Sequence, residues 1–565
     1  MCGIVAVIHA DPSSDSAAAD LHDALYLLQH RGQDACGIAT CGTGGRIYQC
    51  KGNGLASKVF NDGERVAELP GFMGVGHLRY PTMGTASGSE AQPLFVNSPY
   101  GICISHNGNL LNSVPLRQFL DQEAHRHINT DSDSEILLNI FANELNDSGK
   151  ARVNADDCFK SLERTYKKCE GSWACTAMIA GLGLMGFRDP YGIRPVVIGS
   201  RKVEGRTDYM IASESVALEF FGCRPEDIRD LLPGEAVIIV KGSEPQFRQV
   251  QPAASYTPDI FEYLYFARPD SIIDGISVEN ARFKMGEKLA ATIKTELGPE
   301  RLAQVDVVIP IPETSNTSAR AVAKHLEKEL ITGFNRYIFR TFLMSSQRLR
   351  RSGVRRKLNA MSAEFRDKNV LLVDDSIVRG NTSLEICLMA REAGAKSIIF
   401  ASASPPIRHS HIYGVDLAIS DELIAYSKTP AEVATAIGAD MVIYQTLPDL
   451  VAACAELSPR GRDCQFESGV FSGCYVTGVP DGYFEHLERI RSSLKTKAGT
   501  TPQDVAERKG GGNKRSKTPK AAGHTANGTT VDGDLSQAAA RVQLEPDQSL
   551  VTPPSQDISL HNLND

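Results

Sequence analysis

The sequence predicts an α+β sandwich in the first half of the chain, an α/β domain with a parallel sheet in the second half, and a disordered C-terminal tail. Three observations indicate this order. Residues 1–240 alternate short apolar runs with glycine-rich turns, residues 260–485 alternate strands with amphipathic helices, and the last 70 residues contain no Trp, Tyr, Phe, Cys or Met. Strand–helix alternation is typical of a parallel sheet with right-handed crossovers.

In the first half, short apolar runs between turn residues predict strands. We expect them at Ile4–Ile8, 74–76, 102–104, 196–199 and 236–240, with a buried strand pair within Met178–Phe187. A helix is expected over Glu135–Leu145, where Ser132 and Glu135 have the spacing of a capping box. The domain boundary is expected near residues 241–258, because Lys241–Pro245 has the composition of a surface linker.

The second half predicts strands at Val305–Ile311, Val370–Val373 and Ile398–Ala401, separated by helices over Ala319–Leu330 and Leu384–Ala393. The tail is rich in Gly, Ser, Thr, Pro and Lys, and cannot bury enough apolar surface to offset the entropy of ordering. We therefore expect domains at residues 2–240 and 258–490 and a disordered tail at 496–565.

Composition excludes several classes of function. The chain has 565 residues with 60 Lys+Arg against 68 Asp+Glu, a net charge of −8, so no global basic surface predicts nucleic-acid binding. No apolar run is long enough for a membrane helix, and no basic residue precedes the apolar run at the start, as a secretory signal would require. The 13 cysteines are scattered without metal-site spacing. We expect a cytoplasmic protein with no nucleic-acid or membrane partner.

An acidic pair, Asp374 and Asp375, ends the apolar strand that begins at Asn369. The turn that follows is rich in small polar residues and leads into a helix that Thr382 and Glu385 open. Free N–H groups at a helix start favour a phosphate, whereas two carboxylates favour ribose hydroxyls or Mg²⁺. Together they predict a site for a phosphorylated ribose, with contacts from Asp374, Asp375, Ser376, Arg379, Gly380, Asn381 and Thr382. A strand that simply ends in two solvated aspartates is the alternative.

This stretch resembles the 5-phosphoribosyl-1-pyrophosphate (PRPP) motif of the type I phosphoribosyltransferases. Ile309–Ser315 is similar to the pyrophosphate loop of that family, so the resemblance implies one Mg²⁺ held by Ser315, Asp374 and Asp375. Between the two motifs, Arg340–Asn359 has seven positive charges and no negative one. We expect a mobile lid there, with Lys357 contacting PRPP; a solvated basic face is the alternative.

Cys2 follows the initiator Met. Removal of Met1 would place a thiol and a free α-amine on one residue, Cys2. The amine can take the thiol proton near neutral pH. Four segments resemble the class II glutamine amidotransferases, which are N-terminal-nucleophile hydrolases: Met1–Val5, Gln29–Asp34, Gly76–Thr82 and His106–Leu110. The resemblance implies Cys2 as the nucleophile, Asn107 and Gly108 as the oxyanion hole, and a glutamine site formed by Arg31, Arg79 and Asp133.

A glutaminase half followed by a PRPP half is the order found in the amidophosphoribosyltransferase family. The resemblance implies that glutamine hydrolysis supplies ammonia to C1 of PRPP, which gives 5-phosphoribosylamine in purine biosynthesis. It also implies a homotetramer inhibited by purine nucleotides. One branch of the family has a cleaved propeptide and a Cys-rich end to the transferase domain; because Cys2 is at the start here and no such group of cysteines occurs, we expect the branch without an iron–sulfur cluster. Two alternatives stay open: another glutamine amidotransferase, such as an asparagine or glucosamine-phosphate synthase, and a PRPP-binding regulator without catalysis.

Overall fold

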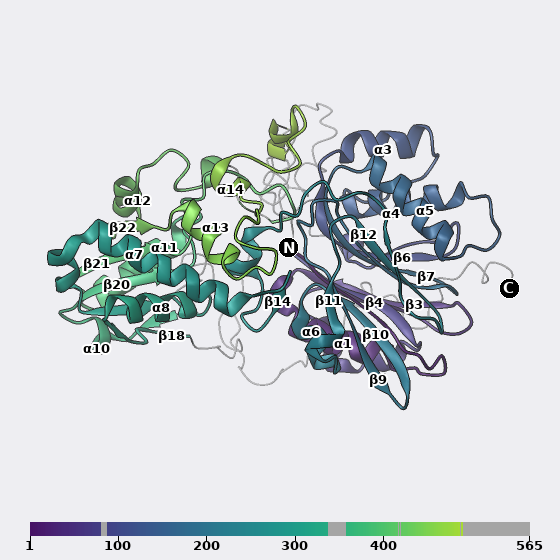
Figure 1. Ribbon diagram of the computed structural model, residues 1–565, viewed down its shortest axis with the longest axis horizontal. Coiled ribbons are helices and arrows are strands. Elements are labelled where there is room, and N and C mark those ends of the chain that lie inside the picture. Colours follow the sequence, from purple (N-terminus) through teal and green to yellow (C-terminus); the bar gives the residue numbers. More distant parts are fainter. Residues whose placement is uncertain (81–87, 337–357, 416, 418–419, 486, 490–565) are drawn as a thin grey trace, which may run out of the picture. The chain divides into compact units, whose positions relative to one another are not determined.

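A computed structural model of the chain describes residues 1–80, 88–336, 358–415, 417, 420–485 and 487–489 (Figure 1). Residues Met1–Asp481 belong to one compact unit, which contains every helix and strand named below. Among the described residues, no helix is both long enough and apolar enough to span a membrane.

The first half of the chain contains two antiparallel sheets. The seven-stranded sheet has the order β11 (Ile228–Asp230), β9 (Val197–Val203), β10 (Arg206–Ala212), β1 (Gly3–Ile8), β4 (Met73–Arg79), β2 (Ala35–Cys41) and β3 (Ile47–Asn53). The six-stranded sheet has the order β13 (Gln246–Gln249), β12 (Glu235–Val240), β8 (Gly183–Arg188), β7 (Gly171–Ile179), β6 (Ile102–Leu110) and β5 (Leu94–Val96). The predicted strand pair within 178–187 is the β7–β8 hairpin.

Alternating side chains of β1 place it between two hydrophobic cores. Ile4 and Ala6 belong to the core between the sheets, with Met178 of β7 and Val237 of β12, whereas Val5 packs toward helices α1 and α6. Figure 1 shows helices on both outer sides of the stacked sheets. These helices are α1 (Ala17–Leu27) and α6 (Ser215–Phe221) on one side, and α3 (Ser113–Gln122), α4 (Asp133–Asn146) and α5 (Ala155–Lys168) on the other.

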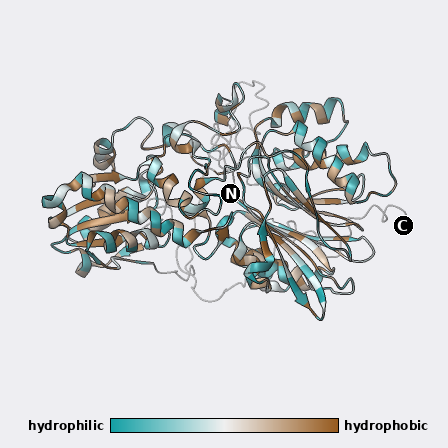
Figure 2. Cartoon of the chain, viewed as in Figure 1, coloured by the Kyte–Doolittle hydropathy of each residue, from teal (hydrophilic) through white to brown (hydrophobic). Residues whose placement is uncertain are grey.

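The second half contains a five-stranded parallel sheet. Its order is β17 (Glu329–Leu330), β16 (Val307–Pro310), β20 (Asn369–Asp374), β21 (Ser397–Ser402) and β22 (Met441–Tyr444). Along β20, Leu371 and Val373 pack on the core with α7 (Val278–Gln304), α8 (Asn316–Leu326) and α13 (Leu447–Ala455). Val370 and Leu372 pack on the opposite core with α11 (Asn381–Glu392) and α12 (Pro430–Ile437). Figure 2 shows these strands as predominantly hydrophobic.

Apart from short 3₁₀ turns, short strands and helices make up the rest of the described secondary structure. They are β14 (Ile272–Ile273), β15 (Ile276–Ser277), β18 (Phe334–Arg336), β19 (Leu358–Ala360), α2 (Ala56–Val59), α10 (Ser362–Phe365) and α14 (Gly469–Ser472). A π-helical turn, Glu262–Phe266, follows the first half and precedes α7.

The predicted order of an α+β sandwich and a parallel-sheet domain is confirmed, and the tail expected at 496–565 lies outside the described residues. Several local predictions are wrong. Lys241–Pro245 is a hairpin turn and not a linker, because β13 pairs with β12 beyond it. The helix expected over Ala319–Leu330 ends at Leu326, and the chain then forms β17. The capping box at Ser132 does not form: its side chain accepts a hydrogen bond from the Ser134 N–H, while Glu135 accepts from the N–H groups of Asn129 and Thr130.

Candidate active site

Most of the residues predicted to bind PRPP surround one cavity of about 470 Å³ in the second half of the chain. Seven of the eight line it: Asp374, Asp375, Ser376, Arg379, Gly380, Asn381 and Thr382. The eighth, Lys357, lies outside the described residues, as does most of the expected lid. Arg379 also pairs with Glu422, at 3.2 Å between Nε and Oε2.

The turn between β20 and α11 brings these side chains together. The parallel strand ends at Asp374, and ligands of open α/β sheets bind at such carboxyl ends. Gly380 precedes α11 with φ of +78°, and a Cβ there would lie 2.3 Å from Cδ1 of Ile424. The helix begins at Asn381 and has no side-chain cap, so the prediction that Thr382 opens it is wrong. Asn381 and Thr382 instead line the cavity.

The two carboxyl groups are each only 7% exposed. Burial, and then the charge of Asp375, raises the pKa of Asp374 well above its usual range. Burial also raises the pKa of Asp375, although hydrogen bonds from Thr314 and Ser376 act in the opposite direction. A divalent cation would offset the cost of holding both groups ionised, so this oxygen donor set fits Mg²⁺. In the described part of the chain, this cavity included, no group of three or more His, Cys, Asp or Glu side chains could hold a metal ion, so the acidic pair is a two-carboxylate donor set.

Within the loop before α8, the hydroxyl that reaches the cavity belongs to Thr314. Its Oγ1 donates a hydrogen bond to Oδ2 of Asp375, and Thr314 lines the cavity. Ser315, the predicted metal ligand, is fully buried and donates its hydroxyl hydrogen bond to the carbonyl of Ile311. Sequence reasoning missed Thr314, although it lies in the same strand-to-helix turn as Ser315.

Cys2 lies at the start of β1 beside the strand that carries the predicted oxyanion hole. Its main-chain N–H donates to Oδ1 of Asn107 at 3.0 Å. The other side-chain atom of Asn107, Nδ2, is buried and has no hydrogen-bond partner in the described part of the chain. There is no space for a side chain at Gly108, because a Cβ there would lie 2.1 Å from the carbonyl oxygen of Ser172. Asn107 and Gly108 are thus fixed next to Cys2, and the Nδ2 group of Asn107 is a buried donor without a partner among the described residues.

The three residues predicted to bind glutamine occupy different environments. Arg79, at the end of β4, is 5% exposed and pairs with Glu90 and, at 3.3 Å, with Asp34. Asp133, the first residue of α4, accepts the N–H of Leu110 at 2.9 Å. Arg31 has no exposed surface, and its Nε donates to the carbonyl oxygen of Cys2 at 3.1 Å.

Tyr80 connects the two predicted sites. Its carbonyl oxygen lies 3.9 Å from Sγ of Cys2, and the same residue lines the cavity of Asp374 and Asp375. It also lines a neighbouring cavity of about 820 Å³, which shares Tyr265 and Phe266 with the first.

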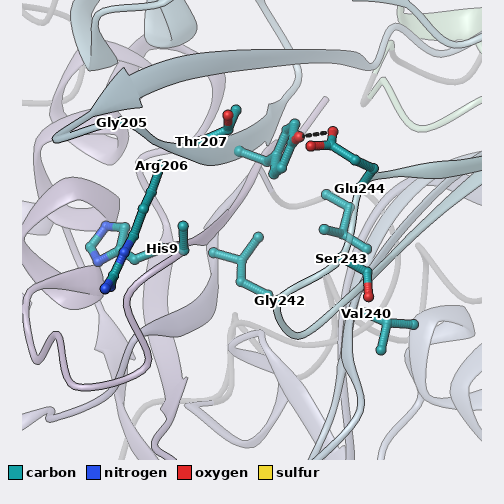
Figure 3. A pocket seen from close by; sticks show the side chains of 12 residues that line it. His9, Gly205, Arg206, Thr207, Val240, Gly242, Ser243 and Glu244 are labelled. Atoms are coloured by element: carbon teal, nitrogen blue, oxygen red, sulfur yellow. Dashed lines mark hydrogen bonds between the residues drawn. The ribbon is translucent and has the colours of Figure 1, made fainter.

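A third hollow, of about 350 Å³, lies away from every predicted residue (Figure 3). Its polar side chains pair within the protein. Tyr209 donates to Glu244, His9 bonds with Asp20 at 2.8 Å, and Arg206 pairs with Asp11 at 3.2 Å.

The comparisons with known proteins cover both halves. A family model for a glutamine amidotransferase domain matches residues 77–220. The amidophosphoribosyltransferase of Lachancea kluyveri is 54% identical over 89% of this chain and 98% of its own length. The amidophosphoribosyltransferase of Escherichia coli (strain K12) is 51% identical over 87% of this chain and 96% of its own length.

A solved structure with the same arrangement is glutamine PRPP amidotransferase from B. subtilis, complexed with ADP and GMP. It matches with a TM-score of 0.72 and 31% identity, over 85% of this chain and 98% of that chain. Because the matches extend through both halves, a synthase that shares only the first half does not account for them. The chain therefore belongs to the amidophosphoribosyltransferases and is a glutamine-dependent pentosyltransferase of purine biosynthesis, as the order of its two motifs predicts.

Proposed function

We propose that Cys2 hydrolyses glutamine within a domain formed by residues 2–240. Removal of Met1 frees the α-amine of Cys2, which takes the thiol proton. The thiolate adds to the carboxamide carbon, the C–N bond breaks, and ammonia leaves with that proton. Water then cleaves the thioester to give glutamate. The buried Nδ2 of Asn107 supports a role in stabilising the oxyanion, together with the N–H of Gly108.

Arg79 and Asp133 are the groups that bind the glutamine backbone in this proposal. The guanidinium of Arg79 pairs with the α-carboxylate, exchanging its contacts with Asp34 and Glu90 for the substrate. Asp133 accepts a hydrogen bond from the α-ammonium. Arg31 contacts the main chain of Cys2, so we assign it to positioning the nucleophile.

PRPP binds in the cavity of about 470 Å³ that Asp374 and Asp375 line, within a domain formed by residues 258–490. Asn381 and Thr382, at the start of α11, bind the 5-phosphate with N–H groups, helped by Ser376, Arg379 and Gly380. Asp374 and Asp375 would orient the ribose hydroxyls and hold one Mg²⁺, with the hydroxyl of Thr314 at the same cavity. Ser315, the ligand implied by the motif, would have to release its bond to the carbonyl of Ile311 to take part. When bound, Mg²⁺ neutralises charge on the pyrophosphate leaving group. Lys357 is proposed as a further PRPP contact from the sequence alone.

The transfer joins the two chemistries. Ammonia attacks C1 of PRPP, the C1–O bond to pyrophosphate breaks, and a proton leaves the new amine. The observation that carries this proposal is the position of Tyr80, which lies beside Cys2 and also lines the PRPP cavity. Ammonia released at Cys2 is therefore produced next to the acceptor site.

We also propose a cytoplasmic homotetramer inhibited by purine nucleotides. Nucleotide inhibition is supported by the ADP and GMP named with the B. subtilis structure. A reducing compartment is supported by the 13 free cysteines, 10 of which are buried. An iron–sulfur cluster is not part of this proposal.

The test replaces Cys2 with Ala and measures phosphoribosylamine formation with glutamine or with ammonium. The glutamine-dependent rate should fall by at least about a thousandfold. The ammonium-dependent rate should stay within about twofold of wild type, because the PRPP cavity is unchanged. Equal loss of both rates would show that the two sites do not divide the reaction in this way.

A further inference from the structure

In the structure, which retains Met1, side chains contact both main-chain groups of Cys2. Asn107 accepts its N–H at 3.0 Å, and Arg31 donates Nε–H to its carbonyl oxygen at 3.1 Å. Arg31 is fully buried, so its guanidinium position depends on its protein partners alone. Through Arg31, those partners therefore set the position of the carbonyl group of Cys2.

The main partner of Arg31 comes from the second half of the chain. Glu262 accepts hydrogen bonds from both terminal nitrogens of Arg31, at 3.0 and 2.7 Å. Glu214, from the first half, accepts from one of them at 2.6 Å. The contact with Glu262 holds both terminal nitrogens of the planar guanidinium and so contributes to the direction of its Nε–H.

Glu262 is itself held in place from its own side. Arg194 contacts it and also pairs with Asp259 at 2.8 Å, and Asp259 pairs with His411 at 2.8 Å. The side chains of all four residues are at most 2% exposed. Glu262 also begins the π-helical turn whose later members, Tyr265 and Phe266, line the PRPP cavity.

The chain next to His411 contacts β6, the strand that carries Asn107 and Gly108. The Nδ2 group of Asn109 donates to the carbonyl oxygen of Ile412 at 2.8 Å. Gly414 approaches the oxyanion strand so closely that a Cβ would lie 2.7 Å from the carbonyl oxygen of Gly108. The second half therefore contacts the glutaminase centre both behind Cys2 and at the predicted oxyanion hole.

We propose that Glu262 is a positioning residue for glutamine hydrolysis: through Arg31 it fixes the main chain of Cys2, so the second half of the chain completes the glutaminase centre. The inference rests on the proposed role of Cys2. Glu262 touches no reacting atom. Without its carboxylate, the buried charge of Arg31 keeps only Glu214, and the guanidinium turns away from Cys2.

The experiment compares Glu262→Gln and Glu262→Asp with wild type. For Glu262→Gln, kcat for glutamine hydrolysis should fall about 10- to 100-fold, because small misplacement of a nucleophile has effects of that size. The KM for glutamine and the ammonium-dependent rate should each stay within about threefold, since neither depends on the position of Cys2. Glu262→Asp retains the charge and should recover part of kcat.

Glu144→Gln is the matched control. Glu144 is also 2% exposed and pairs with two cations, Arg164 and Lys168, but lies on α4. Its loss should leave the ratio of glutamine- to ammonium-dependent rates unchanged. The proposal is overturned if both Glu262 variants keep the wild-type ratio, or if Glu262→Asp loses both activities equally. If Glu262→Gln does not fold, the ratio of glutamine- to ammonium-dependent rates in Glu262→Asp tests the proposal by itself.

A Cys2→Ala arm separates this inference from the function on which it rests. If Cys2→Ala still hydrolyses glutamine, the assignment of the nucleophile is wrong. If Cys2→Ala is inactive and the Glu262 variants match wild type, only the positioning role is wrong.

Discussion

The two polar atoms of the Asn107 side chain have different partners. Oδ1 accepts the N–H of Cys2, and Nδ2 is buried without a partner in the described residues. A buried donor without an acceptor lowers the stability of the folded protein, and such a donor is typical of a site where a ligand supplies the acceptor. The oxyanion of glutamine hydrolysis is the acceptor that we assign to it.

Asn107→Asp isolates this donor, because the carboxylate keeps the acceptor for Cys2 and loses the amide hydrogens. We expect kcat for glutamine hydrolysis to fall about 10²- to 10³-fold, as for other oxyanion donors, with the ammonium-dependent rate retained. Steady-state assays with both nitrogen donors measure this. Asn139→Asp, at a buried position of α4, is the control and should change neither rate. A normal glutaminase rate in Asn107→Asp would exclude Asn107 as the donor.

Single residues also show where sequence reasoning stops. The motif around Asp374 predicts residue types that must lie together, and seven of them do line one cavity. Which of two neighbouring hydroxyls, Thr314 or Ser315, reaches that cavity depends on the local turn and not on the motif. The contact of Arg31 with Glu262 joins residues 231 positions apart, and spacing along the chain does not predict such a pair.

Among the elements, the turn between β20 and α11 is tightly packed at Gly380, beside the predicted PRPP cavity. Gly380→Ala would add strain at a φ of +78° and an overlap with Ile424. We expect kcat/KM for PRPP to fall about 10- to 100-fold with either nitrogen donor.

Gly438→Ala provides the control for that substitution. Gly438 has a similar φ of +75°, but the nearest atom to a new Cβ is 4.0 Å away. It should lower the melting temperature without changing the response to PRPP. If both variants respond to PRPP alike, the close approach at Gly380 has no role in binding.

The acidic pair predicts a pH dependence of stability. Because the folded-state pKa values of Asp374 and Asp375 are raised, the folded protein binds more protons than the unfolded chain above the ordinary carboxyl pKa. The metal-free protein therefore loses stability as the pH rises through the raised values.

The double substitution Asp374→Asn with Asp375→Asn should remove this loss of stability. In EDTA, the variant should therefore have a higher melting temperature than wild type, and the difference should be larger at about pH 8 than at about pH 5. Thermal unfolding at both pH values measures it. Added Mg²⁺ should raise the melting temperature of wild type but not that of the variant, so the difference between the two proteins should become smaller. A difference that does not change with pH would contradict the raised pKa values.

The sheets show what can be predicted at the scale of elements. Continuous apolar runs predicted β1 and β20, because both strands lie between two cores and bury side chains on both faces. The hairpin at Lys241–Pro245 was misassigned because a polar turn inside a domain has the same composition as a linker. Only the pairing of β13 with β12 distinguishes the two.

At the scale of the whole molecule, the candidate glutaminase centre and the predicted PRPP cavity belong to one compact unit, Met1–Asp481. Tyr80 from the first half lines the PRPP cavity, and Glu262 from the second half holds Arg31 behind Cys2. Each half thus contributes to the site of the other, and ammonia made at Cys2 should reach PRPP before it mixes with solvent ammonia.

The most direct test of this account follows the nitrogen atom. Wild-type protein is given PRPP and glutamine labelled with nitrogen-15 in the amide, together with unlabelled ammonium, and the phosphoribosylamine is analysed by mass spectrometry. We predict label in most of the product from wild type and none in the product from Cys2→Ala, which should use only the ammonium. Product from wild type that carries no more label than free ammonia in solution, or labelled product from Cys2→Ala, would contradict the account.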